Sequence, residues 1–499
     1  MHFKKSILLP VVFIGLWALV QCFFARPESI VNDWMGWRQT DTQTIARNFL
    51  HNGGNILYPQ INWGGNGPGY VESEFQLYPF LIAAVMRFTG EAEWPGQLLN
   101  IIFFILTAFF IFKELSFRFG IIPAFFSAAV FLTSRSTVFL STSVQPDSLC
   151  FMLYCFGLIY FFRFLESQGH KELFISIFFS ALAALVKPTS LHIGIIQFLL
   201  VLFISPRLFR KGYLWAAWFF ILAIVTIYLF HAHTLYTNYG NTFGIGIGGD
   251  SKFPSLRSLI NPILYLKLIY MTIVWGIGPL AAIAGVYLIY KRKINSIEWA
   301  CIIGNIVLLV CAMRVTTSRA DGPHYHVFTS FLGAWLCAHA ASDLMEHEYT
   351  ALKNKIIIFV LIFFIVTQYI FNVNMRGNKL QQGWTPQAII ATGQKLREFI
   401  HPEEFIIVRS MFLSRAEEFW GGGINNYEDP RLFYMTRTRG WVIASDIKGI
   451  DLINEYVNRG ANYYVETGKR LNNPELYDWL HIKSRLVFDT DSGRIYCFK

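Results

Sequence analysis

The feature that most constrains this chain is a succession of apolar stretches that runs from its first residues to about residue 373. Each stretch approaches the roughly 20 residues that a helix needs to cross a bilayer. Because a bilayer offers no water to backbone amides, such stretches fold as helices. They lie near residues 6–24, 96–112, 120–134, 148–164, 173–186, 190–206, 213–230, 264–290, 296–312, 327–342 and 356–373. The sequence therefore predicts a polytopic α-helical membrane protein with about eleven transmembrane helices.

The composition supports a membrane protein. Charged residues make up 15% of the 499 residues, against roughly 25% in soluble domains, which excludes a soluble multidomain enzyme. Aromatic residues make up 17%, as is typical of lipid-facing and interfacial surfaces. The net charge of +10 comes from short Lys and Arg clusters between apolar stretches, so it carries topology information. We expect membrane lipids as partners, and no nucleic acid.

The basic clusters also predict the orientation. Residues 75–88 are apolar but short, and they contain Pro79 and Arg87, so this segment can be a span or an interfacial helix. If it is interfacial and the N-terminus is cytoplasmic, every basic cluster falls on the cytoplasmic side, as the positive-inside rule requires. These clusters are Lys4 and Lys5, Lys113 and Arg118, Arg163 and Lys171, Arg207 with Arg210 and Lys211, Lys291 to Lys293, and Lys353 with Lys355. The C-terminus is then extracytoplasmic.

Two domains follow from this topology. Residues 1–373 form the transmembrane domain, in which residues 25–95 are a first extracytoplasmic loop with interfacial helices. Residues 374–499 are more polar and form a small extracytoplasmic α/β domain. We expect helices near residues 386–400, 450–459 and 474–480, and strands near 405–410, 462–466, 484–489 and 494–498. The last two strands form a hairpin at Thr490-Asp491-Ser492-Gly493.

The first outer loop contains candidate functional residues. Residues 37–49 read as an amphipathic helix in which Thr40 and Gln43 form a capping box and Asp41 complements the helix dipole. Capping does not account for the neighbouring Trp37 and Arg38, so a functional carboxylate is the alternative. A Gly-rich loop at residues 62–70 is interpreted as a flexible lid, and Glu72 and Glu74 follow it.

Further candidate functional residues lie at the outer ends of the apolar stretches, on the same side of the membrane as the first loop. Asp147 is either an N-cap or a carboxylate facing the same outer cavity as Asp41. Lys187 is either a snorkelling lysine or a cation that binds an anionic group such as phosphate. His324 and Tyr325 fit hydrogen-bonding groups or interfacial anchors better than a zinc site.

These outer carboxylates and cations, in this layout, resemble the GT-C glycosyltransferase superfamily. The resemblance is closest to the bacterial dolichyl-phosphate-mannose-protein-mannosyltransferase-like family, which includes the aminoarabinose lipid A transferases. The stretch from Trp37 to Phe49 resembles a variant of the family's first-loop motif, and Glu74 is similar to the glutamate that opens its interfacial helix. Val144-Gln145-Pro146-Asp147 matches the second outer-loop aspartate, and Lys187-Pro188-Thr189 resembles the basic motif after the fifth span.

The resemblance implies an integral membrane glycosyltransferase, transferring a hexose or pentose from a polyprenyl-phosphate donor to a lipid, glycan or protein acceptor. It places this reaction on the outer face of a bacterial inner membrane. The implied catalytic candidates are Asp41, Asp147 and Glu74; the donor phosphate would bind Lys187 and Arg38; and Trp37, Glu72, His324 and Tyr325 would contact substrate. No cofactor is required, although a divalent metal can take part.

Two alternatives remain open. One is a transporter or flippase for lipid-linked sugars, which would place ionisable residues near the bilayer midplane. The other is a whole-glycan ligase or oligosaccharyltransferase, which uses the same lipid-phosphate chemistry with a larger donor.

Overall fold

The computed structural model describes residues 2–25, 29–245, 253–318, 322–346, 351–382, 385–414, 427–447, 449–468 and 470–499. Within these ranges, side chains are described except at residues 2–9, 25, 351–357 and 379–382. Lys4, Lys5, Lys353 and Lys355, which contribute to the predicted orientation, are therefore outside the described side chains. The chain divides into two compact units. We call Met1–Arg26, Gln97–Ile227 and Lys252–Asn378 the helical unit, and Pro27–Gly96, Tyr228–Ser251 and Lys379–Lys499 the mixed unit.

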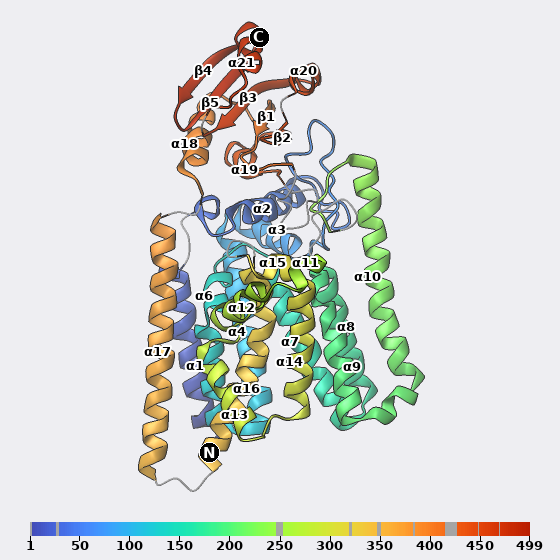
Figure 1. The fold of residues 1–499 in the computed structure, drawn as a ribbon, viewed down its shortest axis with the longest axis vertical. Coiled ribbons are helices and arrows are strands. Elements are labelled where there is room, and N and C mark those ends of the chain that lie inside the picture. Colours follow the sequence, from blue (N-terminus) through green and yellow to red (C-terminus); the bar gives the residue numbers. More distant parts are fainter. Residues whose placement is uncertain are drawn as a thin grey trace. The chain divides into compact units, whose positions relative to one another are not determined.

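The predicted apolar stretches of the helical unit form helices, many of which run side by side in Figure 1. Its first elements are α1 (His2–Val20), η1 (Gln21–Ala25), α4 (Trp94–Phe119), α5 (Ile121–Thr133), α6 (Arg135–Leu140), α7 (Asp147–Ser167), α8 (His170–Val186), η3 (Pro188–Leu191), α9 (His192–Ile204), η4 (Pro206–Arg210) and α10 (Gly212–Tyr239). The first residues of α4 and the last turns of α10, from Tyr228 on, belong to the mixed unit. There follow α11 (Leu256–Leu259), α12 (Pro262–Met271), η5 (Thr272–Ile277), α13 (Pro279–Tyr290), α14 (Ser296–Cys311), α15 (Met313–Thr316), η6 (Pro323–Phe328), α16 (Thr329–Glu346) and α17 (Ala351–Gln382).

Four helices of the described chain, α4, α7, α10 and the apolar part of α17, are long and apolar enough to span a membrane. A fifth candidate is the pair formed by Pro262–Ile277 and Pro279–Tyr290, which bends by 107°. The stretch predicted as a span near residues 264–290 is therefore divided, because Gly278 takes a positive φ of 84° and Pro279 starts a new helix. Several other predicted spans are apolar helices of 10–17 residues. The number of about eleven spans stays a prediction.

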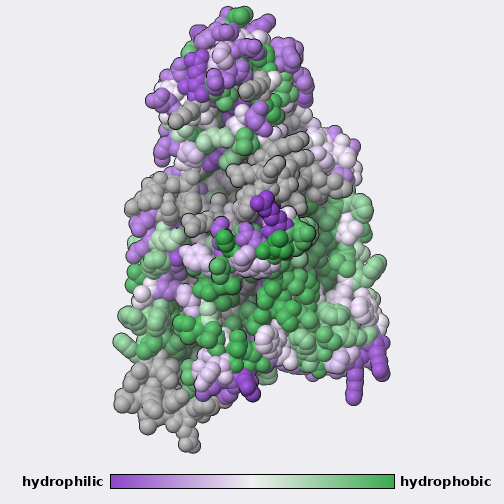
Figure 2. All heavy atoms as spheres, in the orientation of Figure 1, coloured by the Kyte–Doolittle hydropathy of each residue, from purple (hydrophilic) through white to green (hydrophobic). Residues whose placement is uncertain are grey.

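The spans differ in what surrounds them. In α7, 89% of the most apolar 18-residue stretch is buried within the protein, whereas in α17 only 11% of the corresponding stretch is buried. Exposed residues of α17 such as Phe359 and Phe363 are large and apolar, and Figure 2 shows hydrophobic residues over much of the surface of the helical unit. Such a surface suits contact with lipid. Helix α7 is an interior helix, and it carries Asp147 at its first turn.

The mixed unit combines the first loop with the C-terminal domain. The loop contributes η2 (Ile30–Asn32), α2 (Gly36–His51) and α3 (Leu77–Thr89). The C-terminal part contains α18 (Gln387–Leu396), β1 (Phe405–Arg409), α19 (Arg431–Thr436), β2 (Arg439–Ile443), α20 (Ile450–Asn458), β3 (Ala461–Thr467), α21 (Pro474–Lys483), β4 (Ser484–Thr490) and β5 (Gly493–Phe498). The sheet order is β2-β1-β3-β5-β4, with β1 parallel to both β2 and β3 and the remaining pairs antiparallel.

The predicted α/β character of the C-terminal part is confirmed. The expected hairpin is formed by β4 and β5, which pair Thr490 with Gly493. The sequence patterns predict neither strand β2 nor helix α19.

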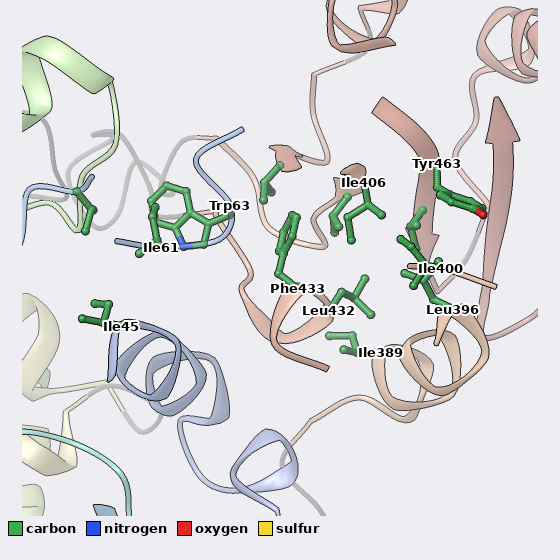
Figure 3. Packing of buried hydrophobic residues seen from close by; sticks show 14 of the residues in the cluster. Ile45, Ile61, Trp63, Ile389, Leu396, Ile400, Ile406, Leu432, Phe433 and Tyr463 are labelled. Carbon is green, nitrogen blue, oxygen red and sulfur yellow. The ribbon is translucent and has the colours of Figure 1, made fainter. Parts of the chain in front are cut away.

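One hydrophobic core joins the first loop to the C-terminal part within the mixed unit. Ile45 of α2 and Ile61 and Trp63 of the following loop belong to the same buried cluster as Ile406 of β1 and Phe433 of α19 (Figure 3). The compact units therefore divide the chain differently from the predicted domains at 1–373 and 374–499. The functional division into those domains stays a prediction.

The Gly-rich loop is bonded to the C-terminal strands. The Gly65 amide donates to the Gly440 carbonyl at 2.6 Å, and the Gly440 amide donates to the Asn62 carbonyl at 3.0 Å. The Asn66 amide group donates to the Arg459 carbonyl at 3.0 Å. The loop interpreted as a flexible lid is therefore hydrogen-bonded to the C-terminal part through the Asn62 carbonyl, the Gly65 amide and the Asn66 side chain, and its flexibility stays a prediction.

Candidate active site

Asp41 lies inside helix α2 and not at its start. The helix begins at Gly36 after Met35, which takes a left-handed conformation with φ 53°. The Thr40 hydroxyl donates to the Trp37 carbonyl at 2.8 Å, and the Gln43 amide group donates to the Ala92 carbonyl at 2.7 Å. The predicted capping box is therefore wrong. Asp41 lies beyond the first turn, so helix capping does not explain it.

The Asp41 carboxylate is held by an indole. Its side chain is 5% exposed, and Oδ1 accepts a hydrogen bond from Trp63 Nε1 at 3.0 Å. Burial raises the pKa of Asp41 well above its usual value, and the bond from Trp63 opposes this rise. Asp41 thus has two properties of a general base that works near neutral pH, a raised pKa and a fixed orientation.

Two carboxylates of the C-terminal part also act on Asp41, and no sequence pattern marks either of them. The negative charges of Asp429 and Glu428 raise the pKa of Asp41 further. Arg431 partly compensates Asp429, through Nε at 2.8 Å and Nη2 at 2.6 Å. Burial raises the pKa of Glu428 to about 7. These two residues are 387 and 388 positions beyond Asp41 in the printed numbering, so no local pattern could associate them with it.

The other candidates of the first loop form separate pairs. Arg38 Nη2 lies 3.6 Å from the carboxylate of Glu74, and both side chains are partly exposed. Trp37 is half-buried beside Arg38 in α2. Glu72 is buried; it accepts a hydrogen bond from the Thr242 hydroxyl and lies 3.5 Å from His233 Nδ1. These contacts make Glu72 a structural partner of the last turns of α10 and of the segment that follows it.

In the helical unit, the structure brings Asp147 and Lys187 together. Lys187 Nζ donates to Asp147 Oδ1, and the two residues are 2% and 1% exposed. Asp147 makes no side-chain cap of α7, so the N-cap interpretation is wrong. The snorkelling interpretation of Lys187 is wrong as well, because a snorkelling ammonium ends in water and this one ends in a buried ion pair.

Tyr325 completes the surroundings of the pair. Lys187 Nζ lies 4.6 Å from the centre of the Tyr325 ring, a distance at which a cation and an aromatic face attract each other. His324 is buried next to it, with the two ring centres 4.2 Å apart. Four residues predicted for the site, Asp147, Lys187, His324 and Tyr325, are therefore grouped in the helical unit.

His192 links the elements that carry this group and was not predicted from the sequence. Its Nδ1 lies 2.8 Å from the Thr189 carbonyl, and its Nε2 lies 3.1 Å from the Tyr154 hydroxyl. Because a carbonyl only accepts, Nδ1 carries the proton and Nε2 accepts from Tyr154. The ring also packs against Phe328 with centres 5.1 Å apart. His192 thus contacts η3, α7 and η6, the elements beside or containing Lys187, Asp147 and Tyr325.

The predicted candidates are divided between the two compact units, with Asp147, Lys187, His324 and Tyr325 in the helical unit and the others in the mixed unit. The shared cavity expected for Asp41 and Asp147 stays a prediction. Among the residues that the structure describes, no three His, Cys, Asp or Glu side chains are grouped so that they could hold a metal ion. The expectation that no metal is required also stays a prediction.

Comparisons with known proteins agree with this architecture. Residues 76–231 match the family model for dolichyl-phosphate-mannose-protein mannosyltransferase. No curated protein sequence matches the chain significantly.

Solved structures match over nearly the whole chain. ArnT from Cupriavidus metallidurans in the apo state has a TM-score of 0.61 at 11% identity, covering 100% of this chain and 98% of that one. ArnT bound to undecaprenyl phosphate has a TM-score of 0.58 at 12% identity, covering 98% and 97%. The oligosaccharyltransferase AglB from Archaeoglobus fulgidus, in complex with an inhibitory peptide and a dolichol-phosphate, has a TM-score of 0.54 at 13% identity, covering 94% and 70%. The chain therefore shares the fold of ArnT and AglB, as the resemblance of its outer-loop motifs to GT-C glycosyltransferases led us to expect, and residues 76–231 are similar to the dolichyl-phosphate-mannose-protein mannosyltransferase family.

Proposed function

We propose that this protein transfers one sugar, a hexose or a pentose, from a polyprenyl-phosphate donor to a lipid, glycan or protein acceptor outside a bacterial inner membrane. The observation that carries the proposal is the buried Lys187–Asp147 pair beside Tyr325. A buried ammonium is suited to a lipid-linked phosphate because it offers several donors on one compact charge. The full-length similarity to ArnT, which has been solved with undecaprenyl phosphate, supports the donor class.

The reaction needs two contributions from the protein. An acceptor oxygen or nitrogen forms a bond to C1 of the sugar, while the bond between C1 and the phosphate oxygen breaks and its electron pair leaves with the phosphate. The acceptor loses a proton to a base, and the departing phosphate needs cations. The polyprenyl phosphate is released with the lipid chain unchanged.

We assign the phosphate to Lys187, with Arg38 as the second candidate cation. In this assignment Lys187 exchanges part of its contact with Asp147 for a charge-assisted hydrogen bond to the phosphate. Arg38 is partly exposed and only 3.6 Å from Glu74, so it is accessible to a ligand. Tyr325, His324 and Trp37 are assigned to contacts with substrate.

Asp41 is the first candidate for the base. Its raised pKa makes it a stronger base than an ordinary carboxylate. Asp147 is less suited because Lys187 already neutralises one of its oxygens, and Glu74 is less suited because Arg38 is beside it. Asp147 and Glu74 remain alternative candidates for the base, and single substitutions of each carboxylate can distinguish them from Asp41.

A whole-glycan ligase or oligosaccharyltransferase is the second candidate, favoured by the similarity to AglB. The two differ in what is transferred, one sugar or a preassembled chain. Mass spectrometry of surface glycans from cells with and without the gene distinguishes them. We expect the deletion to remove one monosaccharide from an otherwise intact glycan or lipid. Loss of a whole glycan would favour the ligase, and unchanged surface glycans would contradict both.

A further inference from the structure

Buried polar atoms without a protein partner gather on the two segments that carry the Asp147–Lys187 pair. They are both side-chain polar atoms of Gln145, Oδ2 of Asp147, Oγ1 of Thr189 and Oγ of Ser190. Gln145 and Ser190 are fully buried. Buried polar atoms in native proteins are nearly always hydrogen-bonded. A group of exceptions at one place therefore needs an explanation.

The two segments are brought together by the ion pair itself. Gln145 lies two residues before Asp147, and Thr189 and Ser190 follow Lys187 by two and three residues. Asp147 Oδ1 accepts from Lys187, so its unpartnered Oδ2 belongs to the same small region. The sequence motifs that contain these residues were singled out for Asp147 and Lys187 alone.

Both segments have fixed backbones. The side-chain amide of Asn100 donates to the Ser143 carbonyl and, at 3.0 Å, to the Gln145 carbonyl. The Ser190 amide donates to the Lys187 carbonyl at 2.9 Å, and His192 donates to the Thr189 carbonyl. The side chains of Gln145, Thr189 and Ser190 are therefore attached to ordered backbone, so loop disorder does not explain the missing partners.

Another buried glutamine of the same unit shows what a satisfied side chain looks like. Gln197 donates to the Ser180 hydroxyl at 3.1 Å and accepts from Trp218 Nε1 at 3.0 Å. Gln145 has neither kind of contact. The difference indicates that Gln145 is adapted to a ligand and Gln197 to the fold.

The chemistry of these atoms identifies the class of ligand. An amide and two hydroxyls are neutral and can both donate and accept, and Asp147 Oδ2 can accept. Sugar hydroxyls likewise donate and accept, so they can pair with all of these atoms. A phosphate accepts only and would leave the acceptors without partners. We propose that Gln145, Thr189, Ser190 and Asp147 Oδ2 bind the hydroxyl groups of the donor sugar and select it.

This inference rests on the proposed function for the identity of the donor, but binding tests it without turnover. The probes are undecaprenyl phosphate and undecaprenyl-phosphate-linked glucose, mannose and galactose, added to the full-length protein in detergent. The variants are Gln145→Met and Ser190→Ala, which remove hydrogen-bonding atoms and keep most of the side-chain volume. The matched control is Gln197→Met.

We expect the wild type to bind one sugar-linked lipid more tightly than undecaprenyl phosphate. Each variant should lower the affinity for that sugar-linked lipid by about ten-fold for each hydrogen bond lost. The affinity for undecaprenyl phosphate should stay unchanged. Gln145→Met should not lower the unfolding temperature, because it breaks no hydrogen bond within the protein. Gln197→Met should lower that temperature and keep the preference for the sugar-linked lipid.

Two results would overturn the inference. One is a preference for the sugar-linked lipid that survives both variants. The other is an equal loss of affinity for both lipids, which would place these residues at the phosphate or in the fold. If the preference is lost in the variants and the wild type transfers no sugar, the sugar subsite stands and the proposed transferase function fails. If the wild type transfers sugar and the variants keep the preference, the transferase function stands and the sugar subsite fails.

Discussion

Replacing Lys187 by methionine separates the structural and the functional roles of the buried ion pair. Methionine keeps most of the apolar stem but leaves the Asp147 carboxylate, which is 1% exposed, without its partner. Removing one member of a buried pair costs about 3–5 kcal/mol, because an uncompensated charge remains in the interior. The contact with Tyr325 adds up to about 2 kcal/mol when it is desolvated. We therefore expect a clear fall in the unfolding temperature of Lys187→Met.

The double variant Lys187→Met/Asp147→Asn should recover most of that stability. Replacing both members of a buried pair by neutral groups is often neutral or stabilising. Thermal unfolding in detergent, followed by tryptophan fluorescence, measures this directly. Lys395→Met is the control for an exposed pair: Lys395 pairs with Glu398, and the two side chains are 37% and 57% exposed, so its loss should cost about 1 kcal/mol or less.

Activity should not recover with stability. A lost charge-assisted bond to the donor phosphate is worth about 1.5–3 kcal/mol, which is a fall of roughly ten- to a hundred-fold in kcat/KM for the donor. The acceptor dependence at saturating donor should change little. If the double variant is stable and uses the donor like the wild type, Lys187 is a structural residue and the phosphate assignment is wrong.

Single contacts and the topology allow four further predictions. Asp41→Asn should abolish transfer and stabilise the protein at pH 7. Because the pKa of Asp41 is raised in the folded state, the stability of the wild type falls as the pH rises from the ordinary carboxyl pKa to the folded-state pKa. The stability gained by the Asn variant should therefore vanish at low pH. Trp63→Phe removes the bond that lowers the Asp41 pKa, so the acid limb of the kcat/KM profile should move to higher pH, and an unmoved limb would exclude Asp41 as the titrating base. Gly65→Ala adds a Cβ 2.5 Å from Trp441 Nε1 at a φ of +76°; it should cost about 1–2 kcal/mol and make the loop more sensitive to proteolysis. Alkaline phosphatase fused after Lys499 should be active, and inactivity there would refute the predicted topology.

Local sequence patterns predicted much of the fold. The apolar stretches became helices, and the Thr490 to Gly493 turn became a hairpin with the expected pairing. The elements that the sequence did not predict depend on contacts with residues distant in sequence. Strand β2 is only five residues long, and its position beside β1 comes from packing. The bend at Gly278 was missed because an apolar run gives the same signal whether or not it is broken.

Sequence patterns identify the candidate site residues one by one but do not predict the contacts between them. The capping pattern of Thr40 and Gln43 places Asp41 at a helix start, whereas the observed N-cap is Met35, five residues before Thr40. Asp147 and Lys187 were both singled out, but residues 40 positions apart give no local sign that they form an ion pair. The unpartnered atoms of Gln145 and Ser190 could only be recognised once the structure showed that both side chains are buried.

A proteoliposome assay decides whether this membrane protein transfers sugars or translocates lipid-linked sugars. Purified protein is supplied with a radiolabelled undecaprenyl-phosphate sugar and with an unlabelled extract of surface lipids and glycans as acceptor, and labelled acceptor and free undecaprenyl phosphate are both quantified. We expect one undecaprenyl phosphate to be released for each sugar transferred by the wild type, and neither product from Asp41→Asn. Movement of the intact lipid-linked sugar between leaflets with no release of undecaprenyl phosphate would contradict sugar transfer and favour a flippase.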